Sequence, residues 1–146
     1  MSIVISSIES VPFATWKAMW LDYLGEYAVG LPDEQHQTTY TRLADPQFNL
    51  SGLIGESGHP VGFAHYYFHA STFHLSEACC LQDLYVSPSA RGRGIGRELV
   101  EAVAGRARSR GASVLHWKTR DSNLAAQALY SRFAQRSDFV SFSLRL

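Results

Sequence analysis

Arg91-Gly92-Arg93-Gly94-Ile95-Gly96 is a glycine-rich turn between an apolar run, Ala78–Val86, and a helical pattern that begins near Ile95. Glycines let backbone N–H groups point at a ligand, and a helix N-terminus adds positive potential, so such a turn favours a phosphate ligand. A P-loop would need Gly-x-x-x-x-Gly-Lys-Ser/Thr, which the sequence lacks. A dinucleotide fingerprint needs a small residue three positions after Gly94, where Arg97 stands. By itself, the turn therefore predicts only a phosphate-binding loop.

The rest of the chain alternates strand-like and helix-like patterns around this loop. Strands are predicted at Ile3–Ile8, Phe48–Gly55, Val61–Phe68, Ala78–Val86, Ser113–Thr119 and Phe139–Leu146. Helices are predicted from Pro12 to Gly30, over Gln35–Leu43, from Ile95 to Gly111, and from Ser122 or Asn123 to about Gln135. No repeat or linker divides the chain, so we expect one mixed α/β domain over residues 1–146.

Net charge is zero, but the two halves differ. Residues 1–80 carry eight carboxylates against two basic groups, and residues 81–146 carry five against eleven, giving −6 and +6. A basic half suggests an anionic ligand and an acidic half a cationic one, although solvated helix faces give the same counts. A dedicated nucleic-acid binder is not expected, because the total charge is low and aromatics are not interleaved with the arginines.

Two further features argue against a membrane-spanning protein and against a secreted one. Lys17, Asp22 and Glu26 interrupt the longest apolar stretches, so no membrane span is expected. Cys79 and Cys80 are adjacent, with no further cysteines for a disulfide framework or zinc cage, and the N-terminus lacks a signal-peptide pattern. These features predict a cytoplasmic protein in which both thiols are buried apolar side chains.

Three segments together resemble the GNAT superfamily of acyl-CoA-dependent N-acyltransferases. They are Gln82–Pro88, the Arg91–Gly96 turn, which matches the family's Gln/Arg-x-x-Gly-x-Gly/Ala motif, and Asn123-x-x-Ala126-x-x-Leu129-Tyr130. The resemblance is strongest over Leu81–Phe133. A finer similarity to the histone-and-polyamine acetyltransferase subgroup involves Trp20, Tyr23, Tyr27, Arg42–Pro46 and Leu81–Tyr85.

The resemblance implies both a fold and a cofactor. The fold is a mixed, mostly antiparallel sheet of six to seven strands flanked by about four helices and splayed between strands 4 and 5. Acetyl-CoA would lie in that gap against the backbone of Leu84, Tyr85 and Val86, with Asn123 near its pantetheine or pyrophosphate arm. Its pyrophosphate would be held by the loop residues Arg91, Gly92, Arg93, Gly94, Ile95, Gly96 and Arg97.

Acyl transfer to an amine needs a proton acceptor, an oxyanion donor and a proton for the departing thiolate. By position, Tyr130 matches the family's general acid, although Leu129, Tyr130 and Phe133 also have the spacing of a helix core. The backbone N–H of Leu84 or Tyr85 is the expected oxyanion donor.

The residue that acts as general base is harder to assign. Related polyamine acetyltransferases place a glutamate where Gln82 stands, and Gln82 cannot accept a proton. Asp83 is the nearest substitute, directly or through a water, although a carboxylate in an apolar strand is as often a structural hydrogen-bond acceptor. Tyr23, Glu26 and Gln82 are the candidate substrate residues, and Asp22 lies one helical turn from Glu26, where the pair either grips a cation or forms a solvated face.

The histidines have no metal-ligand spacing, so we expect no metal and interpret His65, His69, His74 and His116 as packing or pocket polar groups. The predicted function is acetyl-CoA-dependent acetylation of a primary amine on a small cationic substrate, a polyamine or amino-acid-like molecule. The alternatives are acetylation of protein lysines, a noncatalytic acyl-CoA-binding module and a nucleotide- or RNA-binding domain. A homodimer is predicted, paired through Phe139–Leu146 or through the first helix.

Overall fold

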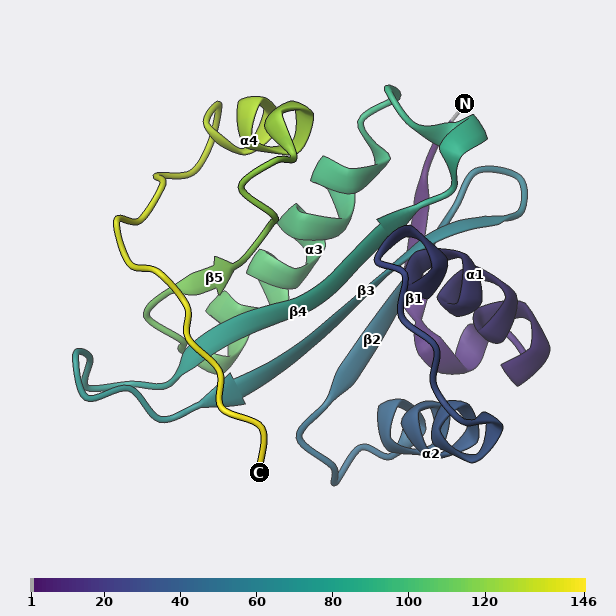
Figure 1. Ribbon diagram of the computed structural model, residues 1–146, viewed down its shortest axis with the longest axis horizontal. Coiled ribbons are helices and arrows are strands. Elements are labelled where there is room, and N and C mark those ends of the chain that lie inside the picture. The colour runs from purple at the N-terminus through teal and green to yellow at the C-terminus, as the bar shows by residue number, and fades with distance from the viewer. Residues whose placement is uncertain (1) are drawn as a thin grey trace.

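A twisted sheet with helices on both faces organises residues 2–146, the part of the chain that the computed structural model describes (Figure 1). The strands are β1 (Val4–Ser7), β2 (Ser51–Glu56), β3 (Pro60–His69), β4 (Ala78–Val86) and β5 (Leu115–Trp117). The helices are α1 (Phe13–Glu26), α2 (Asp33–Ala44), α3 (Ile95–Arg110) and α4 (Leu124–Tyr130), with short 3-10 turns η1 (Ile8–Ser10) and η2 (Pro88–Ala90).

The strands lie in the order β1-β2-β3-β4-β5, and β1 to β4 pair with one another in antiparallel fashion. The last strand, β5, runs parallel to β4 and pairs with it only from Cys79↔Leu115 to Leu81↔Trp117. Beyond Leu81, β4 continues to Val86 with no strand beside it on that edge among the described residues. The predicted splay between the fourth and fifth strands is therefore confirmed.

A β-bulge in β4 re-aims its side chains at the start of this gap. His65 of β3 pairs with Asp83, but the next residue, Tyr66, pairs with Leu81, so Gln82 is the extra residue. Leu81 consequently packs in the core on the α3 side, whereas Tyr85 packs in the core on the α1 side. The bulge leaves Gln82 exposed and turns Asp83 toward α1.

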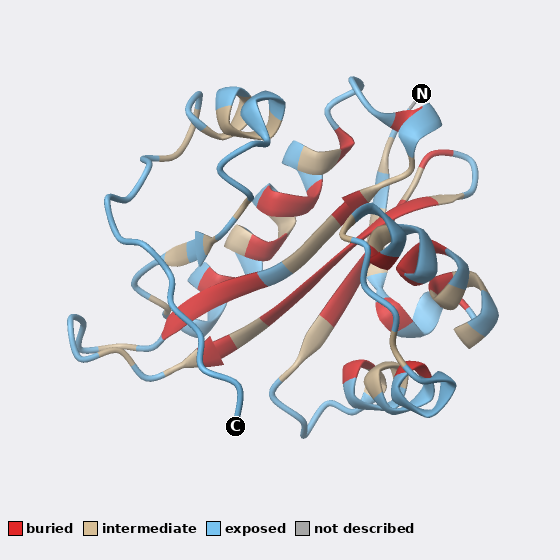
Figure 2. Ribbon diagram, viewed as in Figure 1, coloured by how far each residue is buried: buried red, intermediate tan, exposed pale blue. Residues whose placement is uncertain are grey.

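Two apolar layers cover the sheet (Figure 2). Helix α3 buries Leu99 and Val103 on one face, and Trp16 of α1 is fully buried on the other. Truncating a buried tryptophan of this kind to alanine typically costs about 3–5 kcal/mol. The site described below rests on this rigid α1–β3–β4 layer.

The C-terminal end departs from the sequence-based expectation. Residues 139–146 form no strand, and α4 ends at Tyr130 rather than near Gln135, so the sheet has five strands in the described chain instead of six to seven. The side chain of Phe142 is 93% exposed and that of Leu144 is 84% exposed. The apolar alternation of this segment is that of a strand, but within one copy of the chain its backbone has no neighbouring strand to pair with. No helix among residues 2–146 has the length and hydropathy needed to cross a membrane.

Candidate active site

The glycine-rich turn forms an open cradle at the start of α3. Gly92 and Gly94 have φ values of +78° and +81°, a left-handed conformation that favours glycine, and Gly94 is the N-cap of the helix. A Cβ at either position would meet no atom within 4 Å. The first-turn N–H groups of Ile95, Gly96 and Arg97 have no partner within the helix and receive no side-chain cap, so the turn has the donors that a phosphate needs.

The unpaired edge of β4 leads into this cradle. Leu84, Tyr85 and Val86 lie in the part of β4 that β5 does not reach, so their outward backbone groups are available to an extended ligand. On the other edge, β4 is held very close to β3 at Gly62, where a Cβ would lie 2.5 Å from the Tyr85 carbonyl oxygen. The strand and the turn therefore fit the elongated, phosphate-bearing cofactor that the resemblance implies.

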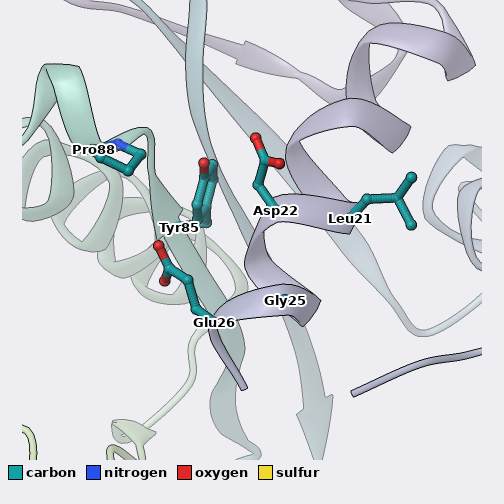
Figure 3. Close-up of a pocket in the computed structure, with 6 residues that line it drawn as sticks. All are labelled: Leu21, Asp22, Gly25, Glu26, Tyr85 and Pro88. Atoms are coloured by element: carbon teal, nitrogen blue, oxygen red, sulfur yellow. The ribbon is translucent and has the colours of Figure 1, made fainter. Parts of the chain in front are cut away.

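The end of α1 is tied to the same turn. Glu26 forms an ion pair with Arg91, and the Arg91 Nε–H also donates to the Val86 carbonyl at 2.8 Å. Next to this pair is a cavity of about 500 Å³, lined by Leu21, Asp22, Gly25, Glu26, Tyr85 and Pro88. In Figure 3 the Asp22 and Glu26 carboxylates extend from α1 toward the same space as the Tyr85 ring. This cavity is acidic, but one of its two carboxylates already has a partner.

A buried polar chain lies on the other side of Tyr23. The Trp16 indole N–H donates to His65 Nε2 at 3.0 Å, and His65 Nδ1 lies 2.9 Å from Asp83 Oδ2. The Tyr23 hydroxyl donates to the other Asp83 oxygen, Oδ1, at 2.9 Å. Burial, followed by the charge of Asp83, raises the pKa of Tyr23 far above its ordinary value, so this hydroxyl stays protonated.

A second cavity, of about 270 Å³, opens where β4 and β5 part. It is lined by Tyr23 and Tyr27 of α1 and by Lys118, Thr119 and Arg120, which directly follow β5. The Arg120 guanidinium lies over the Tyr27 ring at 4.7 Å and donates to the Tyr27 carbonyl at 3.3 Å. Two cations and two tyrosines thus surround a space between the end of α1 and the segment that follows β5.

Tyr130 is the last residue of α4 and packs edge-on against Trp117 of β5, with 5.3 Å between ring centroids. Burial, followed by the charge of nearby Tyr27, raises the pKa of Tyr130 above its ordinary value. Tyr130 is therefore protonated at neutral pH. Asn123 caps α4, since its side-chain oxygen accepts from the Ala126 N–H at 3.1 Å. Of the two predicted starts of this helix, Ser122 and Asn123, the N-cap is Asn123.

Most of the residues singled out from the sequence lie around one gap, but their partners differ. Asp83 is linked to Tyr23, whereas Glu26 is paired with Arg91 and Gln82 is exposed in the bulge. Sequence reasoning missed the partnership of His65 with Asp83 and the two cations of the second cavity. Among residues 2–146, no three His, Cys, Asp or Glu side chains are grouped to hold a metal ion.

Comparison with known proteins identifies the family. The model of the acetyltransferase (GNAT) family matches residues 14–134. The D-amino-acid N-acetyltransferase HPA3 of Saccharomyces cerevisiae is 36% identical over 143 residues, covering 96% of this chain and 89% of that protein. The thialysine N-epsilon-acetyltransferase of Bos taurus is 40% identical over 86 residues, covering 56% of this chain and 50% of that protein.

Solved structures agree in fold. The acetyltransferase AAC(6')-Iy, in complex with a bisubstrate analogue of CoA, superposes with a TM-score of 0.86 at 18% identity and covers 100% of this chain and 99% of its own. Ribosomal-protein-alanine N-acetyltransferase from Brucella melitensis biovar Abortus 2308 superposes with a TM-score of 0.77 at 20% identity, covering 99% of each chain. Given the family match over most of its length, this chain belongs to the GNAT family and is an N-acetyltransferase.

Proposed function

We propose that the protein transfers an acetyl group from acetyl-CoA directly to the primary amine of a small, amino-acid-like substrate. The observation that carries the proposal is the position of the 270 Å³ cavity. It adjoins the end of β5, where β4 loses its partner and leads on to the phosphate cradle of α3. Donor and acceptor binding surfaces thus meet at one gap.

Acetyl-CoA supplies the acetyl thioester, and this chain supplies its binding groups. The backbone of Leu84, Tyr85 and Val86 pairs with the pantetheine arm, and Asn123, the N-cap of α4, approaches the pantetheine or pyrophosphate arm. The turn Arg91–Arg97 binds the pyrophosphate through its N–H groups, because the glycines leave open space there. The +6 charge of residues 81–146 then has an anionic partner.

Three groups perform the chemistry in this proposal. Tyr130 donates a proton to the departing sulfur, and the backbone N–H of Leu84 or Tyr85 stabilises the oxyanion. Asp83 accepts the proton that the amine loses. Gln82, exposed in the bulge beside Asp83, contacts the substrate but does not accept a proton from it.

The charges around the second cavity favour an amino-acid-like acceptor. Lys118 and Arg120 line this cavity and suit a carboxylate, and Tyr23, which also lines it, is hydrogen-bonded to Asp83, the proposed acceptor of the amine proton. A polyamine would bring only positive charge toward Lys118 and Arg120. The names of the relatives, a D-amino-acid and a thialysine acetyltransferase, support the same class.

The test is free-thiol release from acetyl-CoA in the presence of D- and L-amino acids, their carboxamides, polyamines and basic peptides. We expect release with amino acids and much weaker release with the matched carboxamides, which lack the carboxylate. Reaction with basic peptides alone would indicate a protein lysine acetyltransferase. Acetyl-CoA binding without release to any amine would indicate a noncatalytic binding module.

We also propose a homodimer in which residues 139–146 of one copy pair with the open edge of β5 in the other. An alternating apolar segment and an unpaired sheet edge occur in the same chain, and each would satisfy the other. Light scattering should give a dimer mass for the whole chain and a monomer mass for a chain ending at Ser137. If the full and the shortened chains have the same number of copies per particle, this interface is refuted. The buried free thiols of Cys79 and Cys80 are consistent with the cytoplasm as the compartment.

A further inference from the structure

Tyr23 stands between the substrate cavity and Asp83. We propose that the Tyr23 hydroxyl relays the proton of the substrate ammonium to Asp83, and that His65 is a positioning residue that holds Asp83 for this task. The inference rests on the proposed function and specifies how its amine is deprotonated.

The position of Tyr23 indicates a relay rather than direct contact with the carboxylate. Tyr23 lines the 270 Å³ cavity, but Asp83 lines neither that cavity nor the 500 Å³ one. The cavity is linked to Asp83 by the 2.9 Å hydrogen bond from the Tyr23 hydroxyl to Oδ1. A hydroxyl both donates and accepts, so it can pass its own proton inward while it receives one from the cavity.

His65 holds the Asp83 carboxylate in the position that a relay needs. An indole N–H can only donate, so Nε2 of His65 must accept from Trp16 and the ring proton lies on Nδ1. That Nδ1–H then donates to Oδ2 of Asp83 at 2.9 Å. Because His65 is 1% exposed and packs against Phe63 with 4.4 Å between ring centroids, the donor is fixed in place. Each oxygen of Asp83 therefore accepts one hydrogen bond, Oδ1 from Tyr23 and Oδ2 from His65.

The groups facing this chain of hydrogen bonds come from three elements. Tyr23 meets Phe63 of β3 on one side, Asp83 and Tyr85 of β4 on another, and Tyr27 at the C-cap of its own helix, while His65 of β3 faces Asp83. The cations Lys118 and Arg120 lie across the cavity. Burial and the charge of Asp83 raise the pKa of Tyr23 and keep it protonated, so the two proton transfers through its oxygen are concerted and no tyrosinate forms.

Each proton in the transfer has a donor and an acceptor. One ammonium proton passes to the Tyr23 oxygen as the Tyr23 proton passes to Oδ1 of Asp83, which frees the lone pair of the nitrogen. The nitrogen then bonds to the carbonyl carbon, and the carbon–sulfur bond breaks. The sulfur leaves with the Tyr130 proton, and the second nitrogen proton restores Tyr130. Asp83 finally releases its proton to solvent through Tyr23, so each turnover releases one proton.

The Tyr23→Phe variant tests the relay through the pH dependence of kcat/KM for the amine. Without the hydroxyl, only substrate that is already deprotonated reacts, which for an alkylamine of pKa about 10 is about one part in a thousand at pH 7. General-base effects are typically about 10²–10⁴-fold, so we expect a loss of about 10²-fold near pH 7 that shrinks as pH approaches the amine pKa. The affinity for acetyl-CoA, measured by calorimetry, should not change.

The matched control is Tyr40→Phe. It removes another tyrosine hydroxyl of the same aromatic layer, one that donates to the Val11 carbonyl at 2.8 Å and lines neither of the two cavities. Its pH profile should run parallel to that of the unaltered protein. If the Tyr23→Phe profile is also parallel, the loss is structural and the relay is refuted.

Two further variants distinguish the roles of Asp83 and His65. Asp83→Asn keeps the shape but cannot take the proton, so it should show the same pH signature as Tyr23→Phe. His65→Phe should lower kcat with little change in KM, and His65→Asn should restore part of it, because an amide nitrogen can replace Nδ1 as donor. Equal losses in the two His65 variants would refute positioning. An unaltered chain that releases no thiol overturns the proposed function and the relay together, whereas normal turnover by Tyr23→Phe overturns the relay alone.

Discussion

Substitution of Gly94 by alanine separates the effect of the glycine-rich turn on acetyl-CoA binding from its effect on folding stability. The φ of +81° at Gly94 makes alanine unfavourable there by about 1–2 kcal/mol, and a Cβ would extend into the open cradle without touching the protein. Gly105 is the matched control, because it lies within α3, has ordinary helical backbone, and a Cβ added there would also meet no atom within 4 Å. Alanine at Gly105 should stabilise the helix by about 0.5–1 kcal/mol.

The two variants should therefore move stability in opposite directions. At about 2–4 °C per kcal/mol for a chain of this size, Gly94→Ala should lower the Tm by a few degrees and Gly105→Ala should raise it slightly. The affinities of the two variants for acetyl-CoA should differ more than their stabilities. Loss of one charge-assisted hydrogen bond to the pyrophosphate costs about 1.5–3 kcal/mol, so Gly94→Ala should weaken acetyl-CoA binding about tenfold or more.

Calorimetric titration with acetyl-CoA, alongside thermal unfolding of both variants, measures these effects. Gly105→Ala should bind acetyl-CoA as the unaltered protein does. If Gly94→Ala lowers the Tm but leaves the Kd for acetyl-CoA unchanged, the turn is not the phosphate site and the assignment of Arg91–Arg97 fails.

Two other predictions concern groups whose pKa is raised by burial. Tyr130→Phe should reduce thiol release by about 10²–10⁴-fold while acetyl-CoA affinity is unchanged, and unaltered turnover would remove Tyr130 from the chemistry. Burial, followed by the charge of Cys80, raises the pKa of the Cys79 thiol to about 11 from 9.0. Because the folded pKa is the higher one, the stability tied to this thiol is present below about pH 9 and is lost as pH rises toward 11. Cys79 should resist alkylation at pH 8 in the folded protein and react after unfolding; rapid labelling of the folded protein would contradict this burial.

Local patterns were sufficient to predict most elements of the fold. The run Ala78–Val86 is β4 with the expected bounds, and the arginine-rich end of α3 stops before Gly111, whose φ of +85° is the left-handed C-cap that glycine favours. The order of the elements followed from these patterns, whereas the splay beside β5 followed from the resemblance. The Phe139–Leu146 strand was wrong for the isolated chain, because alternation predicts which residues would face a core but not whether a neighbouring strand exists.

The site was harder to predict because its contacts are non-local. Trp16 and His65 are 49 residues apart, and the pairing of His65 with Asp83 depends on a bulge at Gln82 that no sequence signal marked. The cations Lys118 and Arg120 become part of a cavity only because the chain leaves β4 immediately after Trp117. The glycine turn could be predicted because backbone conformation and helix-end chemistry are local properties.

The activity proposed for this chain is acetylation of a small amine that also bears a carboxylate. Its most direct test compares free-thiol release from acetyl-CoA with an amino acid and with the matched carboxamide, at equal concentrations of free amine. We expect thiol release with the amino acid and a marked loss of release with the carboxamide. Equal release from both, or release with neither, would contradict it.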